Sequence, residues 1–196
     1  KPSPYNVAQE IYIDMIPVTD YITSGVWQII LNPTRVVEGQ YDLWLPSENV
    51  LNRGTGFLYP DEEVTLTIPS TADKVISVGA YDALTFSYAS FSGRGYTWQD
   101  ERTKPDLVAP GVNVRTTAVG GGVTVVSGTS FATPFVTGAS ALLMEWGIVR
   151  GNDPFLYGEK VKAYLRRGAR ELPGFGKYPN REVGYGRLCL ERSLPD

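Results

Sequence analysis

Hydrophobic and polar positions divide the chain into two parts of different character. Up to Pro69, apolar residues gather in short runs rich in β-branched and aromatic side chains, separated by turn-forming pairs such as Asn32-Pro33. Four such runs predict β-strands, at residues 11–13, 26–31, 41–45 and 64–68. Because no helical periodicity lies between them, residues 1–69 are expected to form part of an antiparallel, jelly-roll-like β unit.

The pattern changes at about Ser70. A mostly apolar run bounded by turn residues predicts a buried strand of a parallel sheet at residues 74–80, and residues 106–111 and 123–126 are further short candidates. Apolar residues at helical spacing predict helices at residues 131–146 and 159–167. Continuous apolar strands that alternate with helices are typical of a parallel sheet covered by helices. Residues 70–196 are therefore expected to form an α/β domain.

Composition narrows the class of protein. Of the 196 residues, 42% are hydrophobic and 20% are charged, which is typical of a globular protein. The formal net charge of −3 leaves no broad basic surface for nucleic acid. The longest mostly apolar stretch, around residues 139–144, is too short to span a membrane. Cys189 is the only cysteine, which argues against a disulfide-rich secreted protein, and it is interpreted as a small hydrophobic residue.

The segment Gly128–Pro134 is the strongest candidate for chemistry. A serine at a helix start lies beside free backbone N–H groups, which would stabilise the oxyanion formed if Ser130 attacked a carbonyl. Gly128 allows a tight turn and close approach of a substrate, and Pro134 is expected in the first helical turn, where it costs no hydrogen bond. Local physics alone leaves an alternative open, in which Ser130 only caps the helix.

Five blocks, taken in order, resemble the C-terminal part of the subtilase family of serine peptidases. They are residues 75–80, 89–95, 104–112, 128–134 and 184–186. The resemblance implies the subtilisin-like α/β fold, with Ser130 as the acyl-transfer nucleophile and its own N–H as one oxyanion donor. It also implies that Thr129 and Gly128 lie beside a bound peptide substrate. Phe131 departs from the family pattern, where methionine is more usual.

The strand-rich first part resembles the jelly-roll insertion of clostridial subtilases, including the spore germination proteases. Its Trp27 and Trp44 are interpreted as core residues of that unit. The same resemblance points to a bacterial spore or the cytoplasm as the setting. Peptide hydrolysis of this kind needs no cofactor and no catalytic metal, and structural calcium, which is common in the family, is left open.

The chain contains no histidine, although histidine is the general base of subtilases. Because the family order is Asp, His, Ser, both partners and the oxyanion Asn would lie upstream. Asp82, Asp100, Asp106 and Asp153 are not expected to replace the missing Asp. A chain that begins at Lys1, without Met, favours a fragment that is inactive and poorly soluble alone and needs an N-terminal portion of the same protein.

Two alternatives remain open. A sedolisin-type peptidase keeps a similar Gly-Thr-Ser signature but uses carboxylate partners instead of histidine. A subtilase-like pseudoprotease would have lost its triad and would act as a binding or signalling protein.

Overall fold

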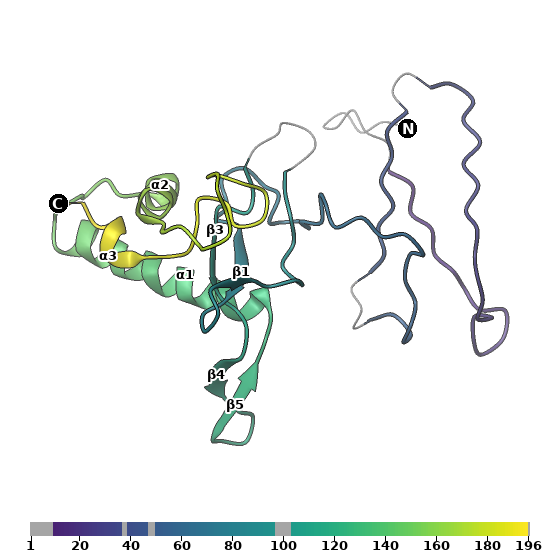
Figure 1. Cartoon of the computed structure of the whole chain (residues 1–196), viewed down its shortest axis with the longest axis horizontal. Coiled ribbons are helices and arrows are strands. Elements are labelled where there is room, and N and C mark those ends of the chain that lie inside the picture. The colour runs from purple at the N-terminus through teal and green to yellow at the C-terminus, as the bar shows by residue number, and fades with distance from the viewer. Residues whose placement is uncertain (1–9, 37–38, 47–49, 97–102, 196) are drawn as a thin grey trace. The chain divides into compact units, whose positions relative to one another are not determined.

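The computed structural model describes residues 10–36, 39–46, 50–96 and 103–195. The chain divides into two compact units, Lys1–Thr55 and Gly56–Asp196 (Figure 1). Segment 62–65 belongs to the second unit, where the Thr65 N–H donates to the Arg94 carbonyl oxygen at 2.9 Å and Arg94 pairs with Glu62 and Glu63. The sequence-based division at residue 70 and the jelly-roll assignment stay predictions.

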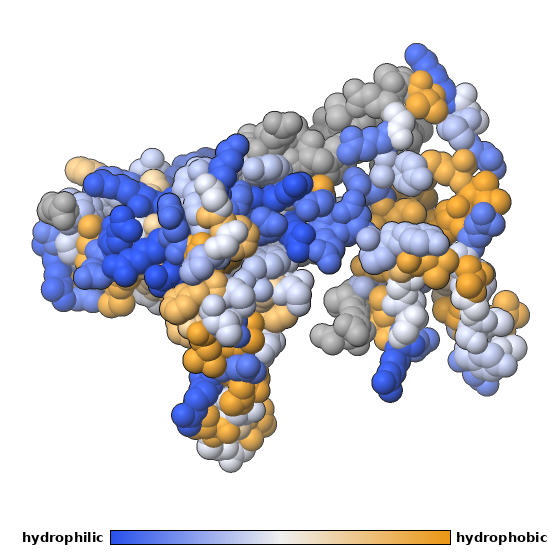
Figure 2. All heavy atoms as spheres, viewed as in Figure 1, coloured by the Kyte–Doolittle hydropathy of each residue, from blue (hydrophilic) through white to orange (hydrophobic). Residues whose placement is uncertain are grey.

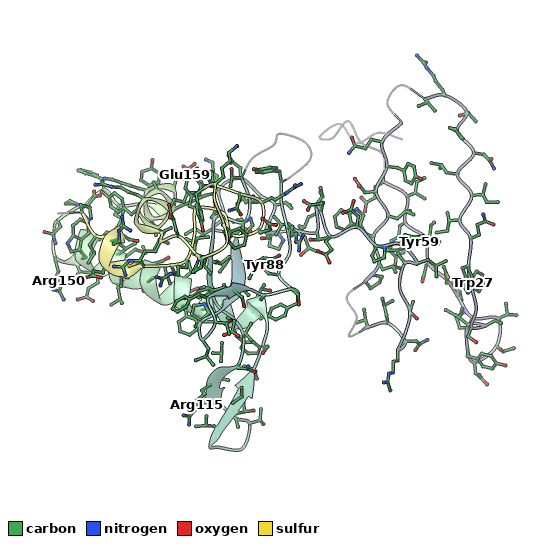
Figure 3. The ribbon with its side chains drawn as sticks, in the orientation of Figure 1. Trp27, Tyr59, Tyr88, Arg115, Arg150 and Glu159 are labelled. Carbon is green, nitrogen blue, oxygen red and sulfur yellow. The ribbon has the colours of Figure 1, made fainter. Side chains whose placement is uncertain are left out.

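The first unit contains no helix or strand among its described residues from 10 to 46. The strands predicted at 11–13, 26–31 and 41–45 are therefore wrong for these residues, as is the one at 64–68 in the second unit. The reason is that a strand needs a hydrogen-bonded partner and a covering layer. Apolar side chains of this unit are exposed instead, as the orange spheres of Figure 2 show, and Trp27 is 60% exposed rather than a core residue. The Trp27 side chain is labelled in Figure 3, and its indole N–H donates to the Thr23 carbonyl oxygen at 3.2 Å.

The second unit holds the regular elements, and its α/β class is confirmed. They are strands β1 (Val78–Asp82), β2 (Ser87–Tyr88), β3 (Leu107–Pro110), β4 (Val114–Thr117) and β5 (Val123–Val126), helices α1 (Thr129–Met144), α2 (Gly158–Gly168) and α3 (Leu190–Ser193), and the π-helical turn η2 (Glu145–Val149). One sheet has the order β2-β1-β3, with β1 and β3 parallel as predicted. Strands β4 and β5 form a separate antiparallel hairpin, and the strand at β4 was not predicted.

Helix α1 packs against β1 and β3 and forms the centre of the core. Its buried residues follow helical spacing, so one stripe of the helix faces the sheet: Ala132, Val136, Ala139 and Leu143. Across the contact lie Ala80, Leu107 and Ala109 from the two parallel strands. Helix α2 adds Val161 and Leu165 to the same cluster. The small residues on both sides allow the helix to lie close to the sheet.

The continuous helical stretch Thr129–Val149 is longer than the helix predicted at residues 131–146, and by length and composition alone it could cross a membrane. Its inner stripe is nevertheless part of the core of the second unit. The core helix of a folded domain can be as long and as apolar as a membrane-spanning helix. On its inner face, the apolar composition of this helix is accounted for by packing against the sheet. Phe135 and Leu142, seven residues apart and therefore on one side of α1, form an exposed apolar surface that we call the outer face, and Ile148 of η2 is exposed as well.

Candidate active site

The candidate nucleophile lies where β5 turns into α1. Gly128 occupies the N-cap position with φ of 153°, a conformation that L side chains rarely adopt, and the helix begins at Thr129. Ser130 is therefore the second helical residue and not the cap, and no side chain caps this helix. The alternative in which Ser130 serves only as an N-cap is wrong.

The surroundings of Ser130 leave its side chain free to react. Ser130 is exposed, while Gly128 and Thr129, which directly precede it, are half-buried. Within the part of the chain that the structure describes, the Ser130 hydroxyl has no hydrogen-bond partner. No acidic residue lies in the first helical turn, and although the Phe131 N–H donates to the Gly128 carbonyl oxygen at 3.1 Å, the N–H groups of Thr129 and Ser130 have no partner among the described residues. The helix start can therefore accept a developing negative charge.

The place of Pro134 differs from the sequence-based expectation. Because α1 begins at Thr129, Pro134 is inside the helix rather than in its first turn. It therefore removes the N–H that would bond the Ser130 carbonyl oxygen. Nearby threonines bond back to the helix, since the Thr133 hydroxyl donates to the Thr129 carbonyl oxygen at 3.0 Å. The turn of helix that carries the candidate nucleophile thus has fewer backbone bonds than a regular one.

The loop between β3 and β4 holds the turn through contacts that the sequence analysis did not predict. The Gly128 N–H donates to the Gly111 carbonyl oxygen at 2.8 Å, and the Asn113 N–H donates to the Ser127 hydroxyl at 2.9 Å. A side chain at Gly111 would meet the Ala80 Cβ at 2.6 Å, so glycine is required by the close packing. The Pro-Gly pair that ends β3 was the only local signal of a special backbone here.

Asp106 does not take the place of the missing triad aspartate. Its carboxylate is fully buried and is shared by Lys104, Lys162 and Arg166, and it also accepts the Ser77 N–H at 2.6 Å. Burial lowers the pKa of Lys162, while the Asp106 carboxylate opposes that shift. This ion cluster ties α2 to the two parallel strands, which is a structural role.

The other aspartates considered from the sequence also have structural partners. Asp82 accepts the Leu84 N–H in the turn after β1. Asp153 accepts hydrogen bonds from Lys160 and Tyr164, which hold the pKa of its carboxyl below its ordinary value. Asp100 lies outside the described residues. Neither of the two described carboxylates is free to orient a base.

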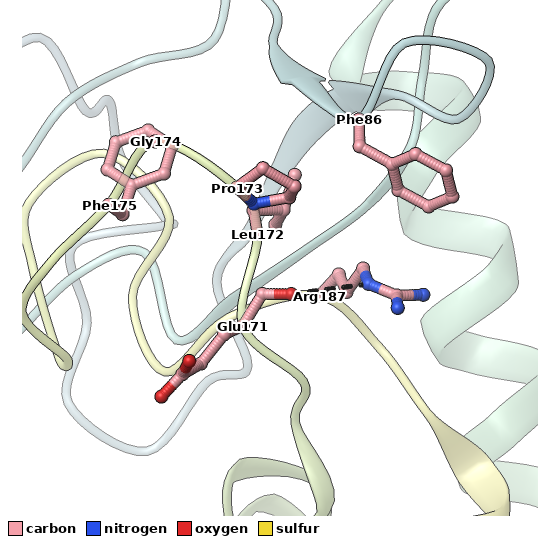
Figure 4. Close-up of a pocket in the computed structure, with 7 residues that line it drawn as sticks. All are labelled: Phe86, Glu171, Leu172, Pro173, Gly174, Phe175 and Arg187. Carbon is pink, nitrogen blue, oxygen red and sulfur yellow. Dashed lines mark hydrogen bonds between the residues drawn. The ribbon is translucent and has the colours of Figure 1, made fainter.

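A cavity of about 490 Å³ lies elsewhere in the second unit (Figure 4). Its seven lining residues are Phe86, Glu171, Leu172, Pro173, Gly174, Phe175 and Arg187. The Arg187 guanidinium lies over the Phe86 ring, 5.1 Å from its centroid, and donates from Nε to the Glu171 carbonyl oxygen. No residue of the Ser130 turn lines this cavity. Among the described residues no group of three or more His, Cys, Asp or Glu is arranged to hold a metal.

An exposed serine at the start of a core helix, in an α/β domain with a parallel sheet, is typical of serine hydrolases that act through an acyl-enzyme. A model of the subtilase family, peptidase S8, matches residues 58–186. The chain therefore belongs to the subtilase family, whose members are subtilisin-like serine proteases that act on peptide or protein substrates.

Similar proteins agree with this assignment. The structure of the Clostridium perfringens CspB protease is 50% identical with a TM-score of 0.70, over 73% of this chain and 30% of that one. Serine protease AprX of Bacillus subtilis is 34% identical over 156 residues, which is 69% of this chain and 33% of that protein. Membrane-bound transcription factor site-1 protease of Mus musculus is 39% identical over 134 residues, which is 66% of this chain and 12% of that protein. The chain thus spans a third or less of these relatives.

Proposed function

We propose that this chain is the nucleophile-bearing part of a subtilisin-like serine endopeptidase, with Ser130 as the nucleophile and Thr129 and Gly128 beside the bound substrate. The observation that carries the proposal is the exposed Ser130 hydroxyl without a partner among the described residues, at the free N–H groups of α1. The segment matched by the family model contains this turn.

In the proposed reaction, the Ser130 oxygen attacks the carbonyl carbon of a peptide bond and the hydroxyl proton passes to a base. The carbonyl oxygen becomes an oxyanion, which the N–H groups at the start of α1 stabilise. The C–N bond then breaks, and the leaving amine takes up the proton. Water releases the acyl group by the same route in reverse. A serine hydroxyl is a weak nucleophile without the base.

The base has to come from another polypeptide segment, because this chain has no histidine. Loss of the histidine of subtilisin lowers kcat by roughly a million-fold, so we expect the chain alone to be inactive. We further propose that an N-terminal portion of the same protein supplies the Asp, the His and the oxyanion Asn. The relatives are three or more times longer than the matched part, which leaves room for such a portion.

The outer face of α1 supports a partner of this kind. From Thr129 to Met144 the helix carries no charged residue, yet Phe135 is 45% and Leu142 is 52% exposed. The polar residues of the helix are all serines and threonines, and large apolar side chains exposed beside them mark a surface that another polypeptide can cover. A polypeptide segment packed on this face would cover the apolar side chains and would bring its catalytic groups to the helix that carries Ser130.

The test is denaturing intact-mass measurement after exposure of the purified protein to a fluorophosphonate probe. An adduct on Ser130, together with a second polypeptide in the same spectrum, supports the proposal. Ser130→Ala should abolish the adduct, and Ser140→Ala, which changes another serine of the same helix, should retain it. If Ser130 stays unlabelled even in the longer gene product, the proposal fails, and a binding or signalling pseudoprotease becomes the better assignment.

A further inference from the structure

The loop that follows β3 contacts the residues just before the candidate nucleophile at two points. At one point the Gly111 carbonyl oxygen accepts the Gly128 N–H, at 2.8 Å. At the other, the Ser127 hydroxyl accepts the Asn113 N–H, at 2.9 Å. The first contact joins two backbones, whereas the second depends on one side chain. Ser127 is thus the residue whose chemistry decides whether the second contact forms.

The loop is bonded to the sheet, so it cannot move together with the turn before Ser130. The Gly111 N–H donates to the Tyr81 carbonyl oxygen at 3.0 Å, which ties the loop to the end of β1. Asn113 has φ of 52°, in the left-handed region that most residues avoid and that asparagine tolerates better than most. This conformation needs support from its surroundings, and the hydrogen bond to Ser127 provides it.

The Ser127 contact bears on Ser130 because the connection between them is short. Gly128 can adopt many backbone conformations, so the direction in which α1 begins is not fixed by Gly128 itself. The two contacts hold the chain immediately before and at Gly128, and only Thr129 separates Gly128 from Ser130. A catalytic group must be held to within roughly half an ångström to act efficiently.

We infer that Ser127 is a positioning residue, whose hydroxyl, bonded to the Asn113 N–H, sets the direction in which the free N–H groups of α1 meet the Ser130 side chain. This inference rests on the proposed role of Ser130. Ser127 touches no reacting atom in this account and acts through the backbone of the turn.

The experiment measures the helix start directly and needs no histidine. Ser130→Cys is made in the full chain together with Cys189→Ala, and the protein is studied with any polypeptide that copurifies with it. The rate of alkylation by iodoacetamide against pH gives the pKa of the introduced thiol. A thiol at a helix N-terminus should have a pKa below its ordinary value of about 8.5, because the free N–H groups stabilise the thiolate.

Two variants of nearly the same shape isolate the hydroxyl. In this background Ser127→Val removes the acceptor, and Ser127→Thr keeps it. With Ser127→Val we expect the thiol pKa to rise by about one unit and alkylation at neutral pH to slow by about tenfold, whereas Ser127→Thr should match the parent. Ser140→Ala is the control, since the Ser140 hydroxyl donates to the Val136 carbonyl oxygen within the helix.

Hydrogen exchange of the Asn113 amide shows whether the contact itself has been removed. If Ser127→Val loses amide protection but keeps the thiol pKa and alkylation rate of the parent, the inference is overturned. It is overturned equally if Ser140→Ala shows the same loss of reactivity, or if the Asn113 amide is unprotected in the parent. The fluorophosphonate result on the unchanged Ser130 is a separate measurement, so failure of the proposed function is distinguishable from failure of the positioning role.

Discussion

Replacement of Asp106 by asparagine should be among the most damaging single changes in the second unit. The carboxylate is fully buried and pairs with three cations, of which Lys104 and Lys162 are themselves buried. Asparagine has nearly the same shape, so packing is conserved while the negative charge is lost. Each buried ammonium would then remain charged without its counter-ion, or would have to lose its proton.

The expected cost follows from what the two lysines retain. Removal of one partner of a buried ion pair typically costs about 3–5 kcal/mol. The Lys104 ammonium still donates to the Val75 carbonyl oxygen at 2.9 Å, and that of Lys162 to the Asp73 carbonyl oxygen at 2.6 Å. Arg166 is 28% exposed and can turn toward water. These remaining partners favour the lower end, so we expect Asp106→Asn to lower the free energy of unfolding by about 3 kcal/mol.

Urea unfolding followed by circular dichroism at the helical band is the assay, because α1 packs on the sheet and Asp106 ties α2 to the residues that precede β3. Glu145→Gln is the control: its ion pair with Arg150 is on the surface, and its loss should cost below about 1 kcal/mol. Addition of Lys104→Met to the Asp106→Asn variant should recover part of the loss. If Asp106→Asn lowers the free energy of unfolding by no more than Glu145→Gln does, the reasoning is refuted, because the two buried lysines would then not need the carboxylate as their counter-ion.

Two further predictions concern the turn and the helix pair. Gly111→Ala should destabilise the chain by about 1–3 kcal/mol, since the new Cβ would crowd Ala80. In the longer gene product it should also reduce fluorophosphonate labelling of Ser130 at least tenfold. The control Gly138→Ala, at an open position on α1, should instead stabilise the chain by about 0.5–1 kcal/mol. Asp153→Asn should lower Tm at neutral pH. Because the folded-state pKa of Asp153 lies below the ordinary value of 3.8, its stabilisation is present above that pH and lost as pH falls through the folded value, so the difference in Tm should vanish in acid.

Local patterns predicted some elements of the second unit, but not β2, β4 or α3. The candidate run at residues 123–126 has the bounds of β5, although β5 lies in an exposed hairpin, and α2 was predicted to within one residue at each end. Both have the residue spacing of their element and clear turn residues beside them. The start of α1 was missed by two residues, and its end by a short π-helical turn, because Gly128 rather than a polar side chain occupies the N-cap.

What could not be predicted depends on contacts between distant residues. The cluster around Asp106 joins residues up to 60 positions apart, and nothing in the sequence beside Arg166 shows that it meets that carboxylate. The contact of Asn113 with Ser127 requires β4 and β5 to pair first. In the first part of the chain the strand-like composition was real, but composition gives no partner strand, and the apolar side chains there are exposed.

The two sides of α1 explain why this chain can form its own core and still lack a complete catalytic site. The inner stripe, from Ala132 to Leu143, is packed by the chain's own sheet, so the helix and the turn that carries Ser130 can be placed without further help. The outer face has exposed Phe135 and Leu142, and the chain has no histidine to serve as a base. Under the proposed function, one polypeptide segment covers the exposed outer face and also supplies the histidine. Its apolar surface would bind where the helix is uncovered, and its histidine would arrive beside Ser130, so assembly and activation would be a single event.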